Sequence, residues 1–117
     1  MEGARLRTLE LATIDDALIE RVRRRIVEAF HPEAIYLFGS AARREATYGS
    51  DLDLLVVMDL LPGVTGLEMS RRIRSLFTGW RLPLDIIVME TGAFAERRSI
   101  PGGIARTAFR EGQRLDG

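Results

Sequence analysis

The sequence predicts a single α/β domain of the α+β kind, in which helices pack on a small mixed β-sheet. The chain has 117 residues, which is enough for one compact core and too few for two ordinary domains. Short apolar runs alternate with amphipathic segments of helical period, and Gly or Pro separates most of them. The expected order is helix, strand, short helix, strand, helix, strand, helix. We therefore treat residues 1–117 as one domain.

The first predicted helix covers residues 14–30. Its apolar side chains recur at helical spacing, and charged residues fill the opposite side. Thr13 is the expected N-cap, and Asp16 is an acidic residue well placed in the first turn. The helix should end before Pro32, because the residue that precedes a proline is disfavoured in helical conformation.

Three buried strands are predicted from short runs that are apolar almost throughout. Such runs are typical of strands that are covered on both faces. Gly39 and Ser40 close the first run, and a further short helix should open at Ala41. The predicted strands are residues 35–38, 52–58 and 84–89.

Two further helices are predicted in the second half of the chain. Thr65 and Glu68 have the spacing of a capping box, which opens a helix that Gly79 should end. The pattern is weaker after the third strand. There we expect a last helix over residues 104–110, with Gly112 as its stop.

The composition limits the classes of function. The chain has 17 basic and 17 acidic residues, so its neutral net charge argues against a partner that is long nucleic acid. It contains no cysteine, which excludes disulfides and thiolate metal sites. No apolar run approaches the ~18 residues of a membrane span, and no signal peptide is evident. We expect a cytoplasmic protein with no membrane partner.

Three aspartates interrupt the predicted strands. Asp51 and Asp53 point the same way on a strand, with Leu52 opposite, and Asp85 interrupts the next strand in the same manner. Carboxylates held close together repel each other and lose water, and a hard divalent ion such as Mg²⁺ relieves both penalties. Alternatively, the strand begins at Asp51 and both carboxylates are solvated at its exposed end.

Gly39 and Ser40 add a second feature. Glycine lets the backbone approach a ligand closely, and free amides at the start of a helix favour an anion. A phosphate cradle beside carboxylates is what a metal-bound nucleoside triphosphate needs. An ordinary strand-ending turn is the alternative for Gly39 and Ser40 alone.

Together these features resemble a known family. The letters GS, then ten residues (41–50), then DLDLLV are similar to the signature of the polymerase-β-like nucleotidyltransferase superfamily. The shortness of the chain points to its minimal nucleotidyltransferase (MNT) branch. The resemblance covers essentially the whole chain, from the first helix to a closing helix with the letters REGQRL. It implies the polymerase-β-like nucleotidyltransferase fold.

The resemblance also implies roles for individual residues. The glycine and serine contact the nucleotide phosphates, the paired aspartates bind two Mg²⁺ ions, and the third aspartate completes the site as ligand and base. Family members often continue GSRARG where this chain has GSAARR, so a basic residue and a glycine are replaced. Arg43 keeps a basic position, as a phosphate contact or as a surface or ion-paired arginine. The implied nucleotide-binding residues are Gly39, Ser40 and Arg43, and the implied catalytic and metal-binding residues are Asp51, Asp53 and Asp85.

The implied reaction is Mg²⁺-dependent transfer of AMP from ATP to a hydroxyl group. Larger members carry a second domain that binds the acceptor, so here the acceptor should come from a partner. In the MNT branch the partner is a HEPN-domain ribonuclease toxin. AMP is added to a tyrosine of that toxin, and the transferase is the antitoxin of a type VII-like toxin–antitoxin pair. We therefore expect a protein adenylyltransferase that forms a hetero-oligomer or a homodimer.

Two other functions fit the same residues. The first is a stand-alone transferase that modifies a small molecule such as an aminoglycoside. The second is a nucleotide-binding antitoxin that neutralises its partner by contact, without transfer. The carboxylates do not encode the acceptor or the nucleotide base, so the sequence leaves these alternatives open.

Overall fold

A computed structural model describes residues 15–39 and 51–115 of the chain. Within these residues a four-stranded sheet has the order β3-β2-β1-β4. The strands are β1 (Ala34–Phe38), β2 (Leu52–Met58), β3 (Leu84–Glu90) and β4 (Gln113–Arg114). The helices are α2 (Asp16–Phe30), α3 (Gly66–Arg74), the 3₁₀ turn η1 (Ser75–Phe77), α4 (Thr91–Arg97) and α5 (Ile104–Glu111).

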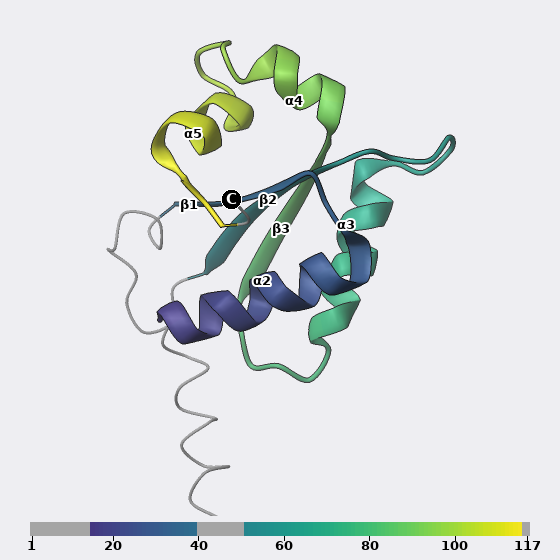
Figure 1. The fold of residues 1–117 in the computed structure, drawn as a ribbon, viewed down its shortest axis with the longest axis vertical. Helices are drawn as coiled ribbons and strands as arrows, with labels where there is room; N and C mark the ends of the chain where they lie inside the picture. Colours follow the sequence, from purple (N-terminus) through teal and green to yellow (C-terminus); the bar gives the residue numbers. More distant parts are fainter. Residues whose placement is uncertain (1–14, 40–50, 116–117) are drawn as a thin grey trace, which may run out of the picture.

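The sheet is mixed, as the sequence predicts. Strand β1 pairs antiparallel with β2 and with β4, whereas β2 and β3 are parallel. The parallel pair needs a crossover, and α3 with η1 supplies it. Figure 1 shows α3 between the end of β2 and the loop that returns to β3. The starts of β2 and β3 therefore lie at the same end of the sheet.

Helices cover both faces of the sheet (Figure 1). On one face, Leu52, Leu54 and Val56 of β2 pack with buried residues of α2 and α3. On the other face, Leu55 and Val57 pack with buried residues of α4 and α5. This alternation explains why β2 is almost wholly apolar, because each face has its own core.

The first helix and the predicted strands agree closely with the structure. The second predicted strand is correct, the first begins one residue earlier at Ala34, and the third extends to Glu90. Thr13, the predicted N-cap of the first helix, lies outside the described residues. Within them the helix begins at Asp16, and the side chain of Asp15 accepts a hydrogen bond from the Leu18 amide.

The later helix boundaries agree less well. The Thr65 hydroxyl caps α3 as predicted and accepts from the Glu68 amide at 3.1 Å. However, α3 ends at Arg74 and continues as η1, several residues before Gly79. Gly112 ends α5 as predicted, although its φ of −85° is not left-handed. A Cβ there would press on the carbonyl oxygens of Ala108 and Leu37, so close packing explains the glycine.

The predicted last helix over residues 104–110 is present as α5, but two other features of the last third of the chain differ from the prediction. Helix α4 was missed because Gly92 weakens its pattern. The signal for it was Glu90, whose carboxylate accepts from the amides of Gly92 and Ala93. The letters REGQRL do not stay helical, because residues 113–114 form β4, which pairs with β1. Long-range pairing overrides local propensity there.

The described part of the chain contains no helix that is both long and apolar enough to cross a membrane.

Candidate active site

The register of β2 and β3 brings two of the three aspartates together. Asp53 and Asp85 are direct partners in the parallel pairing, so their side chains leave the same face of the sheet. Their neighbours Leu52 and Leu84 are also partners and enter the core on the opposite face. The predicted convergence of these two carboxylates from neighbouring strands is confirmed.

Asp51 lies just outside the strand. It is the residue before β2 and is exposed, as is Asp85, whereas Asp53 is partly buried. The alternative that both carboxylates are solvated at the strand end therefore agrees with the exposure of Asp51, but not with the partial burial of Asp53. Asp51 still contributes its negative charge to the site.

The carboxyl group of Asp53 is the electrostatic centre of the site. Burial raises its pKa above the ordinary value, and the negative charges of Asp85 and then Asp51 raise it further. Among the described residues, no cation forms an ion pair with Asp53 that would offset these effects. A bound cation would stabilise the charged form.

Gly39 directly follows β1, and its backbone lies against the carboxylate of Asp53. Its φ of +74° is left-handed, a conformation that side chains other than glycine rarely adopt. A Cβ built on Gly39 would collide with the Oδ2 atom of Asp53. Phe38 is the register partner of Asp53, so the next residue, Gly39, lies close to the Asp53 side chain. Sequence reasoning assigned Gly39 to phosphate contact and missed its contact with Asp53.

The remaining predicted residues cannot be placed. Ser40, Arg43 and the helix expected at Ala41 fall within residues 40–50, outside the described part of the chain. Their assignment to phosphate binding stays a prediction.

The residues of this site suit a hard divalent cation. Carboxylate oxygens are the ligands that Mg²⁺ prefers, and a cation would offset the burial and the neighbouring negative charges that raise the pKa of Asp53. Within residues 15–39 and 51–115, however, no three acidic or histidine side chains are grouped so that they alone could hold an ion. Asp53 and Asp85 are the two carboxylates that the strand register places side by side.

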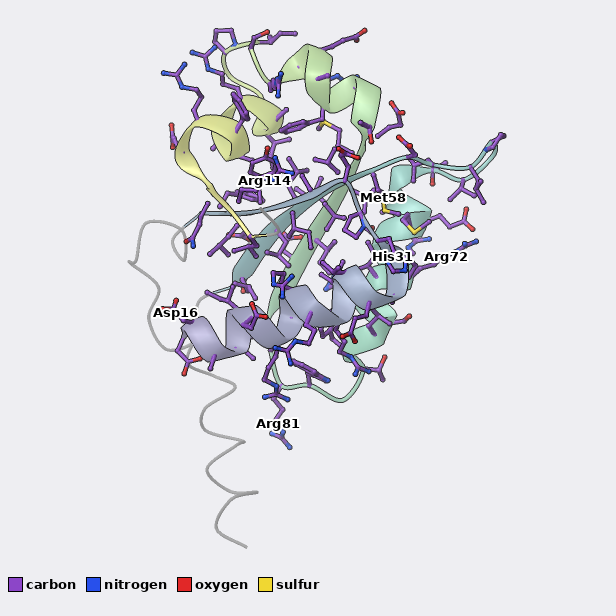
Figure 2. The ribbon with its side chains drawn as sticks, viewed as in Figure 1. Asp16, His31, Met58, Arg72, Arg81 and Arg114 are labelled. Atoms are coloured by element: carbon purple, nitrogen blue, oxygen red, sulfur yellow. The ribbon has the colours of Figure 1, made fainter. Side chains whose placement is uncertain are left out.

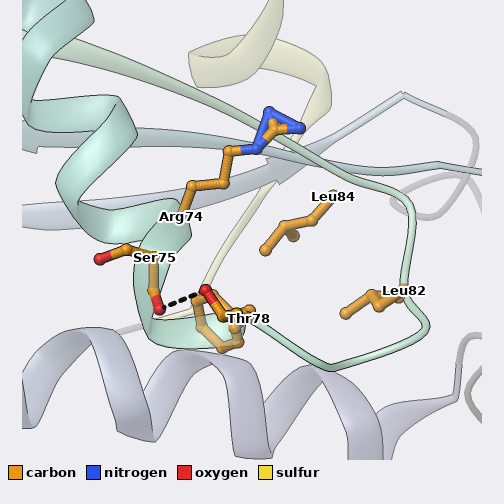
Figure 3. A pocket seen from close by; sticks show the side chains of 6 residues that line it. Arg74, Ser75, Thr78, Leu82 and Leu84 are labelled. Carbon is orange, nitrogen blue, oxygen red and sulfur yellow. Dashed lines mark hydrogen bonds between the residues drawn. The ribbon is translucent and has the colours of Figure 1, made fainter.

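A separate hollow of about 360 Å³ lies on the opposite side of β3 (Figure 3). Leu84 lines this hollow, whereas its neighbour Asp85 points to the other face of the sheet. Within its lining, the Thr78 hydroxyl donates to the Ser75 carbonyl at 3.0 Å. The lining residues are Arg74, Ser75, Phe77, Thr78, Leu82 and Leu84. The hollow is therefore distinct from the aspartate site.

Comparisons with known proteins agree with this arrangement. Residues 19–112 match the family described as a nucleotidyltransferase domain. A solved structure from Sulfolobus solfataricus, titled a "putative nucleotidyltransferase", has a similar fold with a TM-score of 0.58. The two chains are 19% identical over 95% of this chain and 84% of the other, so the likeness concerns the fold alone. No curated protein matches this chain in sequence.

The family match covers most of the chain, including β1, β2 and β3 with Gly39, Asp53 and Asp85. The mixed sheet with helices on both faces is the fold that the solved structure shares. The chain therefore belongs to the nucleotidyltransferase domain family.

Proposed function

We propose that this protein transfers AMP from ATP to a hydroxyl group of a partner protein. The observation that carries the proposal is the pairing of Asp53 with Asp85 beside the close approach of Gly39. Two carboxylates on one face, against a backbone without a side chain, form a place where metal-bound phosphate fits. The family match supports nucleotidyl transfer as the general activity.

Asp51, Asp53 and Asp85 are the residues that would hold two Mg²⁺ ions. When bound, such ions neutralise charge on the transferred phosphate and on the leaving pyrophosphate. Desolvation and repulsion around Asp53 would be relieved in the same event, which couples its ionisation to metal binding.

The proposed reaction forms one P–O bond, breaks another, and moves one proton. The acceptor oxygen bonds to the α-phosphorus of ATP, the bond from that phosphorus to the bridging oxygen breaks, and pyrophosphate leaves. Asp85 is exposed beside Asp53, where it can accept the proton of the attacking hydroxyl. The backbone at Gly39, with Ser40 and Arg43, would hold the phosphates in line.

The exposure of the site favours a large acceptor. Asp51 and Asp85 are both exposed at the start of their strands, so a hydroxyl carried by another protein can reach them. The resemblance to the MNT branch supports a tyrosine of a HEPN-domain toxin as that acceptor. In that case the protein is the antitoxin of a type VII-like pair.

This proposal predicts covalent addition of AMP to the partner. The chain would be co-expressed with a HEPN-domain protein of the same organism, and the intact mass of that protein would be measured. We expect an increase by one AMP or more, located on a tyrosine by peptide mapping.

Two outcomes would contradict the protein-acceptor proposal. Neutralisation of the toxin without any added mass would indicate an antitoxin that acts by contact. AMP transfer to a small hydroxyl compound, with none to the partner, would indicate a stand-alone transferase.

A further inference from the structure

A cluster of arginines surrounds Trp80, the single tryptophan of the chain. The Cζ atoms of Arg21 and Arg25 lie 4.8 and 5.9 Å from the centroid of the indole ring. These two arginines are one turn apart on α2, so one ring orients both guanidinium groups. Phe77 meets the same indole edge-to-face, with centroids 5.0 Å apart. We call Arg21, Arg24, Arg25 and Trp80 the Arg–Trp surface.

The charge of this surface is poorly neutralised. Among the described residues, no carboxylate forms an ion pair with Arg21 or Arg25. Arg25 donates from Nε to the Leu76 carbonyl at 3.1 Å, and this hydrogen bond restrains the orientation of its guanidinium group. Arg24 contacts Glu20 at 3.4 Å, but the same oxygen of Glu20 is held more closely by Arg23, at 2.6 Å.

The Arg–Trp surface is hollowed. Its four residues and Glu28 line a depression of about 200 Å³, which is large enough for a carboxylate-bearing side chain. Arg81 follows Trp80 in the chain and is exposed, and Figure 2 shows its side chain extending away from the protein below α2. The depression therefore lies in a positive region.

We propose that the Arg–Trp surface docks an acidic segment of the acceptor protein. A guanidinium that lies over an indole keeps N–H groups free on its outer edge, where they match carboxylates with two parallel hydrogen bonds. Single-stranded nucleic acid fits less well, because it needs exposed aromatic faces for stacking. Here Arg21 and Arg25 lie over the indole, so its face is not free for a base to stack on.

The position of the surface suits an acceptor that reaches the aspartates. Trp80 lies in the loop that leads into β3, and the Leu52 amide donates to the Pro83 carbonyl of that loop at 2.8 Å. Asp85 lies five positions after Trp80 in the chain, so their Cα atoms are at most roughly 18 Å apart. A protein seated on the Arg–Trp surface can thus extend around the end of the sheet. This link to catalysis, though not the binding itself, rests on the proposed function.

The test uses Trp80 as its own reporter. The full chain would be titrated with hexaglutamate while the NMR signal of the Trp80 indole Nε1–H is followed. Arg21→Gln/Arg25→Gln should weaken binding about tenfold, because two charge-assisted contacts are lost. The matched control is Arg71→Gln/Arg74→Gln, two exposed arginines of α3, which should bind as the wild type does. An RNA hexamer provides a second anionic ligand.

The proposal is overturned if hexaglutamate leaves the indole signal unchanged, if both double variants weaken binding equally, or if the RNA hexamer binds more tightly than the peptide. With the acceptor protein, Arg21→Gln/Arg25→Gln should raise KM and leave kcat unchanged. Failure of AMP transfer by the wild type would remove the proposed function and leave the peptide titration as an independent result.

Discussion

Asp53→Asn should lower the rate of AMP transfer by at least about a thousandfold while the fold stays intact. Asn keeps the shape of the side chain but removes its negative charge. Asp53 is the register partner of Asp85 on the neighbouring strand, so only one carboxylate of the two remains. The rate would be measured as incorporation of labelled AMP into the acceptor protein. Asp59→Asn, an exposed aspartate just after β2, is the control and should keep the wild-type rate. Equal rates for Asp53→Asn and the wild type would exclude Asp53 from the reaction.

The same substitution separates catalysis from stability. Burial and the charges of Asp85 and Asp51 raise the pKa of Asp53 above its ordinary value of 3.8. The folded state therefore binds this proton more tightly than the unfolded state, and stability falls as the pH rises from about 3.8 through the raised value. Asn does not titrate, so the variant lacks this loss of stability. At pH 7 the variant should unfold at the wild-type temperature or above it, which thermal unfolding measures.

Gly39→Ala should reduce transfer at least about a hundredfold, because a small displacement of a reacting group has an effect of that size. The added Cβ would collide with the Oδ2 atom of Asp53 and force that carboxylate to move. Ala in the left-handed conformation of Gly39 is also strained, which lowers the stability by a further ~1–2 kcal/mol. Transfer rates and urea unfolding of the variant would measure both effects.

Gly79→Ala is the matched control for Gly39→Ala. Gly79 also has a positive φ, +90°, but nothing lies within 4 Å of its missing Cβ. Its substitution should carry the backbone strain alone and leave transfer unchanged. The collision itself is tested by repeating Gly39→Ala in an Asp53→Ala background, where the destabilisation should fall to that of Gly79→Ala. An undiminished loss there would show that the contact with Asp53 is unimportant.

Much of the site could be predicted from the sequence because strand periodicity is strict. Asp53 lies between buried Leu52 and Leu54, so its side chain must leave the opposite face of the strand. The same holds for Asp85 between Leu84 and Ile86. Two aspartates on apolar strands therefore suggested a shared site. The Gly-Ser and DLDLLV letters indicated a family that the match over residues 19–112 supports.

The sequence could not supply what depends on register and tertiary contact. No local sequence pattern determines that Asp53 is paired with Asp85 and not with a neighbouring residue of β3. A shift of the register by one residue would place the two carboxylates on opposite faces of the sheet. The contact of Gly39 with Asp53 follows from the pairing of β1 with β2 in the same way. Strand β4 has two residues, so only its partner β1 makes it a strand. The Arg–Trp surface brings α2 to a loop more than fifty residues later.

The proposed function requires Asp53 and Asp85 to hold a divalent cation beside Gly39. Binding of Mn²⁺, a paramagnetic substitute for Mg²⁺, would test it most directly through the broadening of backbone NMR signals in the full chain. We predict that low Mn²⁺ concentrations broaden the signals of Gly39, Asp53 and Asp85 first, and that Asp53→Asn abolishes this selectivity. Broadening that is equal at exposed acids such as Asp59, or that persists in Asp53→Asn, would contradict the claim.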